Sequence, residues 1–348
     1  MRDIFFLRIS PLDLPCYYKV IERGDTMAEI KEISIHDIKH IRIGHAQNEE
    51  HATGCTVIVC DKKAVCGVDV RGGGPASRET ELLDPRMSND GINALLLSGG
   101  SAFGLDAAAG VMKYLEEKGQ GVKVGNAVVP IVVGSCIFDL GCVDGSVRPD
   151  KEMGYAACLD SENNVERNGN VGAGMGATVG KIHGDGFAMK SGLGCYCVQM
   201  GALKVGAIVV VNAVGDVFEM DSDNQLAGLL NKNKDGMLSS EVEAVKLLHL
   251  ASKFSFNTTI GAIITNADLD KAEMNKVAAM ASNGIARTIR PVNTSMDGDT
   301  VYALCTGKVK TCADVVGTVG ARVLGKAIEK AVLSAEEIKG YKCAKSFM

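Results

Sequence analysis

Thr258 is the residue whose position most directly suggests chemistry. It follows Asn257 and stands just before residues 260–264, an apolar run rich in β-branched side chains that predicts a buried strand. Thr258 can simply begin this strand, because threonine is a good strand former and its hydroxyl can bond a nearby backbone group. Alternatively, the chain cuts its own Asn257–Thr258 bond, and Thr258 becomes an N-terminal nucleophile with its α-amine as base. These residues alone favour the first interpretation, since Asn-Thr-Thr is a short, common pattern.

Two carboxylates, Asp297 and Asp299, flank Gly298 just before the predicted strand 301–306. Three interpretations of this pair stay open at this point. It forms a solvated turn, it supplies loop ligands to a metal ion, or it orients the amine of a nucleophile at the start of a strand.

Asn212 and Lys181 also follow segments that predict precise placement. Asn212 ends the β-branched run 205–211, where it either caps a turn or directs its amide donor at a developing oxyanion. Lys181 follows the glycine-rich stretch 169–180 and is either a solvated surface charge or a cation of a catalytic pocket. The residue types allow both interpretations of each residue.

The 41 glycines gather in four stretches, which predict tight turns and close backbone approaches in a compact layered enzyme. The stretch 71–74 forms either a plain turn or a loop whose backbone amides face a ligand. The stretch 169–181 does not satisfy a P-loop, because Met175 and Ile182 occupy positions that need glycine and Ser/Thr. The other two stretches are 98–104 and 190–194.

Composition narrows the class of protein. A chain of 348 residues with 46% hydrophobic content can bury a large core, and no run is long enough to predict a membrane span. The net charge of −5 and the lack of a basic cluster argue against nucleic-acid and anionic-membrane surfaces. The twelve cysteines show no metal-type spacing, so we expect buried, reduced thiols and a cytoplasmic location.

The order of patterned segments predicts an α/β protein. Two apolar runs, 55–60 and 64–70, surround Asp61-Lys62-Lys63 and predict a β-hairpin. Helical spacing is present at 241–254, and long helices are expected at 107–118 and 313–332. We expect residues 1–26 to be an extension that is poorly ordered or not native, and residues 27–348 to form a single domain.

Taken together, these segments resemble the P1 family of self-processing N-terminal-nucleophile-like hydrolases, peptidase family S58. That family includes the L-aminopeptidase/D-Ala-esterase/amidase enzymes, the β-peptidyl aminopeptidases and the nylon-oligomer endo-amidases. The resemblance extends from about Ile41 to Val332. Its motifs are Ile-Gly-His-Ala-Gln at 43–47, Val-Arg-Gly-Gly-Gly-Pro at 70–75, Arg-Glu-Thr-Glu-Leu-Leu-Asp-Pro at 78–85, Leu-Ser-Gly-Gly-Ser-Ala-Phe-Gly-Leu-Asp at 97–106, the stretch 169–181 and Asn-Thr-Thr at 257–259.

The resemblance implies a four-layer α/β/β/α sandwich of the amidase/ornithine acetyltransferase type. It implies autocleavage into an α-chain, 1–257, and a β-chain, 258–348, that remain associated. Thr258 is then the nucleophile, Asp297 and Asp299 hold its amine, Asn212 stabilises the oxyanion and Lys181 is the pocket lysine. The expected substrate is a small peptide or other amide, without a cofactor, metal, nucleic-acid or membrane partner, and the expected assembly is a homo-oligomer, commonly a tetramer.

One departure from the family concerns the substrate. The β-aminopeptidase branch carries a glutamate for the substrate's free amine in the segment that corresponds to 134–139, whereas this chain has Ser-Cys-Ile-Phe at 135–138. We therefore expect an amide hydrolase without a strong need for a free N-terminus. Two alternatives stay open: an acyltransferase resembling the ornithine acetyltransferases, and a non-catalytic binding protein on the same scaffold.

Overall fold

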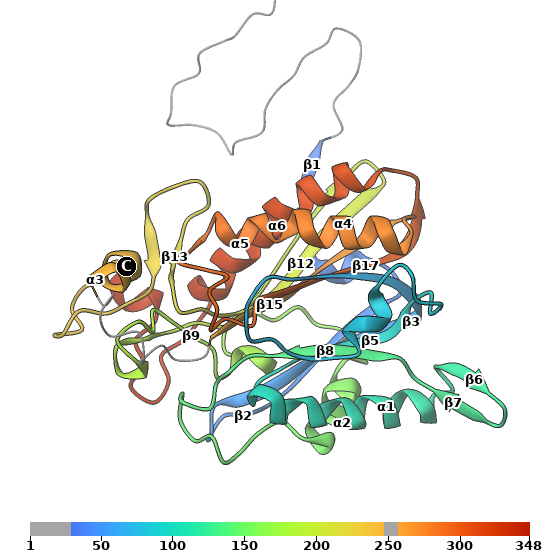
Figure 1. Cartoon of the computed structure of the whole chain (residues 1–348), viewed down its shortest axis with the longest axis horizontal. Coiled ribbons are helices and arrows are strands. Elements are labelled where there is room, and N and C mark those ends of the chain that lie inside the picture. The colour runs from blue at the N-terminus through green and yellow to red at the C-terminus, as the bar shows by residue number, and fades with distance from the viewer. Residues whose placement is uncertain (1–28, 247–256) are drawn as a thin grey trace, which may run out of the picture.

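The chain folds into four layers, with two β-sheets stacked between two layers of helices (Figure 1). A computed structural model describes residues 29–246 and 257–348. Helices α4 (Lys271–Ala281), α5 (Asn283–Ala286) and α6 (Ala313–Leu333) cover the outer face of one sheet. Helices α1 (Ala107–Glu117) and α2 (Lys151–Asp160) cover the outer face of the other. The predicted α/β/β/α sandwich is thus confirmed.

The first sheet contains the strands that matter for the site. Its strands pair antiparallel except for the parallel neighbours β15 and β17. Their order is β1 (Ile30–Ile33), β11 (Leu193–Met200), β12 (Leu203–Asn212), β15 (Thr258–Ala267), β17 (Thr300–Val309) and the second half of β3 (Thr53–Val70).

The second sheet is built around the first half of β3. There β3 lies between β2 and β5, and β5 pairs in parallel with β8, which has β4 at its other edge. The bounds of these strands are Ile41–Asn48 for β2, Ala76–Arg78 for β4, Ile92–Ser98 for β5 and Val132–Cys136 for β8.

The expected hairpin at residues 55–70 is wrong, because β3 is one continuous strand of 18 residues. Asp61, Lys62 and Lys63 are exposed and extended, and they mark the point where β3 passes from one sheet to the other. The pairing of β3 with β5 shifts register between Val59 and Ala64. The segment lacks the glycine or asparagine that a tight turn needs, so its charges face solvent from an extended backbone.

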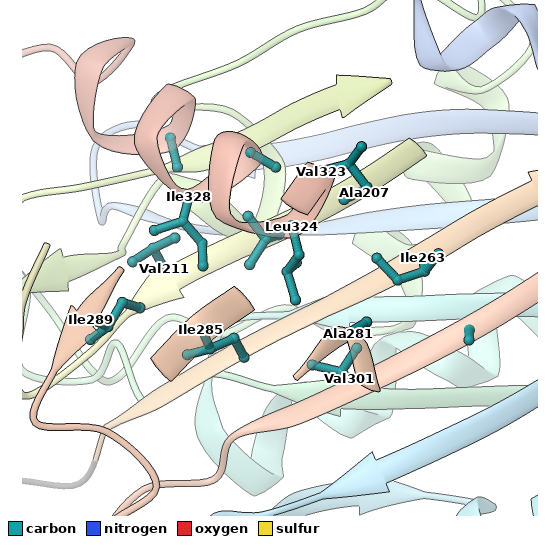
Figure 2. Close-up of a cluster of buried hydrophobic side chains, with 14 of the residues drawn as sticks. Ala207, Val211, Ile263, Ala281, Ile285, Ile289, Val301, Val323, Leu324 and Ile328 are labelled. Carbon is teal, nitrogen blue, oxygen red and sulfur yellow. The ribbon is translucent and has the colours of Figure 1, made fainter. Parts of the chain in front are cut away.

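Three apolar layers hold the sandwich together: one between the sheets, one under α4 to α6 and one under α1 and α2. Between the sheets, side chains such as Ile58 and Leu97 pack against Ile208, Ile260 and Leu304. On the outer face of the first sheet, β12, β15 and β17 meet the helices α4 to α6 through residues that include Val211, Ile263, Val301, Leu324 and Ile328 (Figure 2). Since each central strand is covered on both faces, its near-continuous apolar sequence is explained.

The remaining elements are short. The small strands are β6 (Val122–Val124), β7 (Ala127–Val129), β9 (Thr178–Val179), β10 (Met189–Lys190), β13 (Asp216–Phe218), β14 (Gln225–Ala227) and β16 (Ile289–Arg290). The 3₁₀ turns are Ile35–Asp37, Thr80–Leu83, Ser101–Asp106, Gly172–Gly174, Asp185–Phe187 and Ala344–Phe347. Helix α3 (Ser240–Lys246) confirms the start of the helix expected at 241–254.

Two predictions concern residues that lie outside the described ranges: the rest of that helix, from residue 247, and the extension 1–26. The described cysteines are free thiols, and all of them are buried except Cys312, as the sequence predicts. Across residues 29–246 and 257–348, no helix has the length and apolar character needed to cross a membrane.

Candidate active site

Three neighbouring strands of the first sheet bring the predicted site residues together at the same end of the strands. Asn212 is the last residue of β12, and it lies opposite Thr258, the first residue of the antiparallel strand β15. Asp299 immediately precedes β17, the parallel neighbour of β15. Lys181 reaches Asn212 from the loop after β9. The side chains of these residues and of Asp297 are all buried, although the residues come from distant parts of the sequence.

The Asn257–Thr258 bond is held by contacts on both sides. In the uncut chain, Thr258 Oγ1 donates a hydrogen bond to the carbonyl oxygen of Asn257. The same oxygen accepts the backbone N–H of Gly298 at 2.9 Å, and the Asn257 N–H donates to the Met296 carbonyl at 3.3 Å. A Cβ atom at residue 298 would lie 2.8 Å from Thr258 Oγ1, so the glycine allows this close approach. The arrangement places a hydroxyl and an N–H donor at one peptide bond.

The Asp297–Asp299 segment is buried rather than solvated. Asp299 accepts the backbone N–H of Thr259 at 2.6 Å and that of Asn293 at 3.0 Å. Asp297 accepts the N–H of Thr294 at 2.7 Å. Burial, together with the charge of Asp297, raises the pKa of Asp299 to about 7, and burial also raises the pKa of Asp297.

Of the three interpretations of the Asp297–Asp299 pair, these observations favour the one in which it orients Thr258. The solvated turn is wrong, because both carboxylates are 2% exposed. In the part of the chain that the structure describes, no group of three or more Asp, Glu, His and Cys residues forms a possible metal site. Asp299 instead fixes the backbone just after Thr258 through the Thr259 N–H, and Asp297 fixes the loop before β17 through the Thr294 N–H, which fits a role in orienting Thr258.

The glycine-rich segment at 71–74 holds the acidic segment by backbone contacts. The N–H groups of Arg71 and Gly72 both donate to the Asp299 carbonyl, at 3.0 and 3.2 Å. The Gly74 N–H donates to the Asp297 carbonyl at 2.8 Å, and the Gly73 N–H to Thr294 at 3.2 Å. These amides are therefore already used, which argues against the ligand-facing interpretation. A Cβ at residue 72 would lie 2.3 Å from the Asp297 carbonyl oxygen, so this contact needs glycine.

Asn212 is oriented by the donors that surround it. Its Oδ1 accepts the Thr178 backbone N–H at 3.1 Å and Lys181 Nζ at 2.8 Å, which leaves Nδ2 as the donor atom. Nδ2 donates to the Phe138 carbonyl at 2.8 Å. An amide NH₂ carries two hydrogens, so one further hydrogen bond is possible. Asn212 thus ends its strand as a fixed amide donor rather than as a turn cap.

Lys181 is a buried cation, so the surface interpretation is wrong. Its Nζ donates to Oδ1 and, at 3.0 Å, to the backbone carbonyl of Asn212. Burial lowers the pKa of Lys181 to about 8, while the carboxylates of Asp185 and Asp297 partly oppose this change. The ammonium group fixes the orientation of the Asn212 amide by direct contact.

A second buried lysine, Lys190, was missed by sequence reasoning. It is 0% exposed, and its Nζ donates to the carbonyls of Gly174 at 2.9 Å, Ala177 at 3.0 Å and Ser191. Burial lowers its pKa to about 8. It fixes the loop that ends at Thr178, the residue whose N–H contacts Asn212. A lysine between Met189 and Ser191, in a segment of small and apolar residues, is the signal that the sequence contains.

The comparison with known protein families identifies the chain. The family model described as Peptidase family S58 matches residues 34–346. The chain belongs to peptidase family S58. An uncharacterized aminopeptidase of Mycobacterium leprae is 40% identical over 341 residues, covering 88% of this chain and 92% of its own length. A 6-aminohexanoate-oligomer endohydrolase of Kocuria sp. is 29% identical over 317 residues, covering 85% of this chain and 84% of its own length.

A solved structure supports the fold of this S58 chain. The L-aminopeptidase D-Ala-esterase/amidase of Ochrobactrum anthropi, described as a variant of the N-terminal-nucleophile hydrolase fold, aligns with a TM-score of 0.64 and 17% identity. The alignment covers 88% of this chain and 87% of that structure. The family membership makes the protein a hydrolase that acts on amide bonds, and the resemblance found from its motifs is confirmed.

Proposed function

We propose that the chain activates itself by cutting the Asn257–Thr258 bond and then hydrolyses amide substrates with Thr258 as the nucleophile. The observation that carries this proposal is the pair of contacts at the Asn257 carbonyl. Its oxygen accepts hydrogen bonds from the hydroxyl of the next residue and from the Gly298 N–H. A nucleophile and an oxyanion donor therefore meet at the bond to be cut.

Self-cleavage proceeds through an ester. Thr258 Oγ1 attacks the carbonyl carbon of Asn257, and the Gly298 N–H stabilises the negative charge that develops on the oxygen. The C–N bond breaks, the acyl group is then held by Oγ1, and the hydroxyl proton passes to the departing nitrogen. Water hydrolyses the ester, which leaves a carboxylate on Asn257 and a free amine and hydroxyl on Thr258.

In turnover, the new amine acts as the base for its own hydroxyl. An α-amine has an unperturbed pKa of about 8, so a useful fraction is neutral near pH 7. Asp297 and Asp299 raise that pKa by their charge. Asp299 also holds the backbone next to the amine through the Thr259 N–H, and Asp297 holds the loop before β17 through the Thr294 N–H. Oγ1 attacks the substrate carbonyl as its proton passes to the α-amine, and the Asn212 amide donates to the oxyanion. The substrate C–N bond then breaks, the leaving amine takes the proton from the α-ammonium, and water hydrolyses the ester on Oγ1 to release the acid. One such donor lowers the activation barrier by about 3 kcal/mol.

The two chains are expected to stay together after cleavage. Strand β15 would begin the β-chain, yet it lies between β12 of the α-chain and β17, and β17 in turn pairs with β3 of the α-chain. Separation would break a central part of the first sheet and its apolar layers. We also propose a homo-oligomer, commonly a tetramer in this family, which sedimentation of the cleaved protein tests.

The substrate need not carry a free N-terminal amine. The acidic residue of the segment 134–139 is Asp139, which is buried and accepts Thr53 Oγ1 at 2.7 Å and the Gly100 N–H at 2.6 Å. Ser135 Oγ bonds the Tyr302 hydroxyl at 2.8 Å. We therefore expect similar hydrolysis of an aminoacyl-p-nitroanilide and its N-acylated counterpart. A strong preference for the free amine would contradict this substrate assignment.

The deciding experiment is a denaturing intact-mass spectrum of freshly purified protein. Two fragments, one ending at Asn257 and one beginning at Thr258, are expected, and Thr258→Ala should give only the intact mass. A wild-type chain that stays intact on long incubation would refute the proposal and favour a binding protein. Transfer of an acetyl group from acetylornithine to glutamate by the cleaved protein would instead identify an acyltransferase.

A further inference from the structure

A cavity of about 480 Å³ lies at the opposite ends of the strands that carry the candidate active site. Its walls include Lys204 on β12, Asn266 on β15 and residues 306–309 on β17. Thr258 and Asn266 are eight residues apart on one strand, which corresponds to roughly 26 Å at the usual strand rise. The cavity is therefore separate from the site around Thr258.

The lining of this cavity is rich in positive charge. It includes Lys39, Lys62, Lys204 and Lys308, whereas Asp37 is its single acidic residue. The chain as a whole carries a net charge of −5, with 42 acidic residues against 37 Lys and Arg. A local excess of four ammonium groups over one carboxylate is thus opposite in sign to the protein, and it produces a positive potential that attracts anions.

The positive charge is not neutralised by the residues around it. Within residues 29–246 and 257–348, the ammonium groups of Lys39, Lys62 and Lys308 have no hydrogen-bond or ion-pair partner. Lys204 Nζ donates to the backbone carbonyl of Asp37 at 2.8 Å rather than to its carboxylate. The Asp37 carboxylate accepts the Ser34 N–H at 3.2 Å. Lys39, Lys62 and Lys308 are therefore available to a ligand, and Lys204 has two further N–H donors beside the one it gives to Asp37.

The walls that carry these lysines are fixed by hydrogen bonds between segments. Thr306 Oγ1 donates to the Lys39 carbonyl at 3.0 Å, which attaches the turn before β2 to β17. The Lys204 backbone N–H donates to Asn266 Oδ1 at 2.8 Å, which joins β12 to β15. The framework is thus set, while the lysine side chains, most of them exposed, are free to turn toward a bound group.

We propose that this cavity binds a small polyanion of the phosphate class, such as inorganic di- or triphosphate. Lysine ammonium groups are suited to phosphate oxygens as point charges, and several of them around one cavity match a ligand with several negative charges. The volume is within the range of small-molecule sites, about 300–1,000 Å³. This site is independent of the self-cleavage and hydrolysis proposed above.

Calorimetric titration of the full-length protein with inorganic triphosphate tests the site. We expect one site per chain, weaker binding at higher NaCl concentration, and unchanged binding in Thr258→Ala. The affinity of the double variant Lys62→Gln/Lys308→Gln for triphosphate should be about tenfold lower than that of the wild type. The matched control is Lys123→Gln/Lys276→Gln, which removes the same charge from two exposed lysines elsewhere and should bind as the wild type does.

Three outcomes would overturn the inference. Absence of binding at millimolar triphosphate would exclude the site. Equal weakening in both double variants would show a general effect of net charge, and loss of binding in Thr258→Ala would place the ligand at the candidate active site. Thermal melting of each variant checks that the exposed substitutions leave the fold intact.

Discussion

The two sides of Thr258 are supported in different ways. On one side, the Asn212 amide is oriented by side-chain and backbone donors that include the buried ammonium of Lys181. On the other, the Asp297–Asp299 segment is held by backbone N–H groups, including those of residues 71–74. The side-chain amide of Asn212 must be kept from rotating, because rotation would exchange the places of its oxygen and nitrogen. Specific donors to Oδ1 are therefore needed on this side. A segment with two carboxylates needs its backbone fixed, and close-packed glycine amides do this.

This contrast predicts that catalysis is sensitive to the replacement of a single atom, Nδ2, on the Asn212 side. Asn212→Asp retains the oxygen that accepts from Lys181 and Thr178 but replaces the Nδ2 donor. We expect kcat of the mature protein to fall by about 100- to 1,000-fold, because the oxyanion donor is lost. Steady-state hydrolysis of a p-nitroanilide measures this change.

The matched control for this variant is Asn266→Asp. Asn266 lies on the neighbouring strand, and it also accepts a backbone N–H, from Lys204, while its Nδ2 donates to a carbonyl, that of Ala202. Its kcat should stay within about twofold of the wild type, since it is far from Thr258. A similar loss in both variants would mean that the effect comes from the sheet and not from the oxyanion.

The acidic side should respond to an added methyl group on its glycine support. In Gly72→Ala, the new Cβ would lie 2.3 Å from the Asp297 carbonyl oxygen and 2.4 Å from the Asp299 nitrogen, so the segment must move. A displacement of about 1 Å near reacting groups can cost about 100-fold in rate, and we expect self-cleavage to slow by this order. The time course of the two fragments on a denaturing gel measures it.

Gly74→Ala is the control in the same loop. A Cβ there would come no closer than 3.8 Å to the Asp297 carbonyl oxygen, so the segment can stay in place. We expect cleavage at close to the wild-type rate. If Gly74→Ala slowed cleavage as much as Gly72→Ala, loop flexibility rather than the contact with Asp297 would be responsible.

The two buried lysines separate orientation from support of the backbone. Lys181→Met removes a donor to Oδ1 of Asn212, so kcat should fall by about tenfold while the fold is retained. Lys190→Met leaves three backbone carbonyls without this donor, so the free energy of unfolding should fall by about 3 kcal/mol with a smaller change in kcat. Denaturant unfolding and kinetics on both variants measure the two effects. Equal kcat losses would contradict the separation.

Candidate site residues could be predicted from the sequence where a residue type has few possible roles next to a buried strand. A threonine before an apolar run, an asparagine after one and two aspartates before a third could each be named, and the structure gathers them at one sheet edge. Backbone partners could not be predicted in this way, because Gly72 meets Asp297 more than 200 positions further along the chain, and nothing local marks that contact.

Two predictions based on charged residues failed, one about a turn and one about burial. The exposed charges of Asp61, Lys62 and Lys63 suggested a turn, although an extended strand that passes between two sheets presents the same pattern. Lys190 was overlooked, because a lysine is normally solvated and only a count of the buried carbonyls around it shows why it is inside. Both cases depend on tertiary contacts that a local pattern does not contain.

The smallest predicted effect is on the pH dependence of the folding stability of the uncut chain, and it tests only the Asp297–Asp299 side. In the folded protein the pKa of Asp299 is about 7, whereas an unfolded aspartate has a pKa of about 3.9. Between these values the folded state binds more protons than the unfolded state, so stability should fall as the pH rises from 5 to 8. The Thr258→Ala protein, which stays uncut, should therefore show a lower Tm at pH 8. Adding Asp299→Asn should make this slope shallower, because the substituted side chain does not ionise, whereas adding Asp106→Asn, at an exposed position before α1, should leave it unchanged. A slope that is as steep in Asp299→Asn as without it would assign the proton uptake to another group, such as the buried Asp216, whose pKa is raised to about 6. It would also remove the evidence that burial next to Asp297 raises the pKa of Asp299 before cleavage.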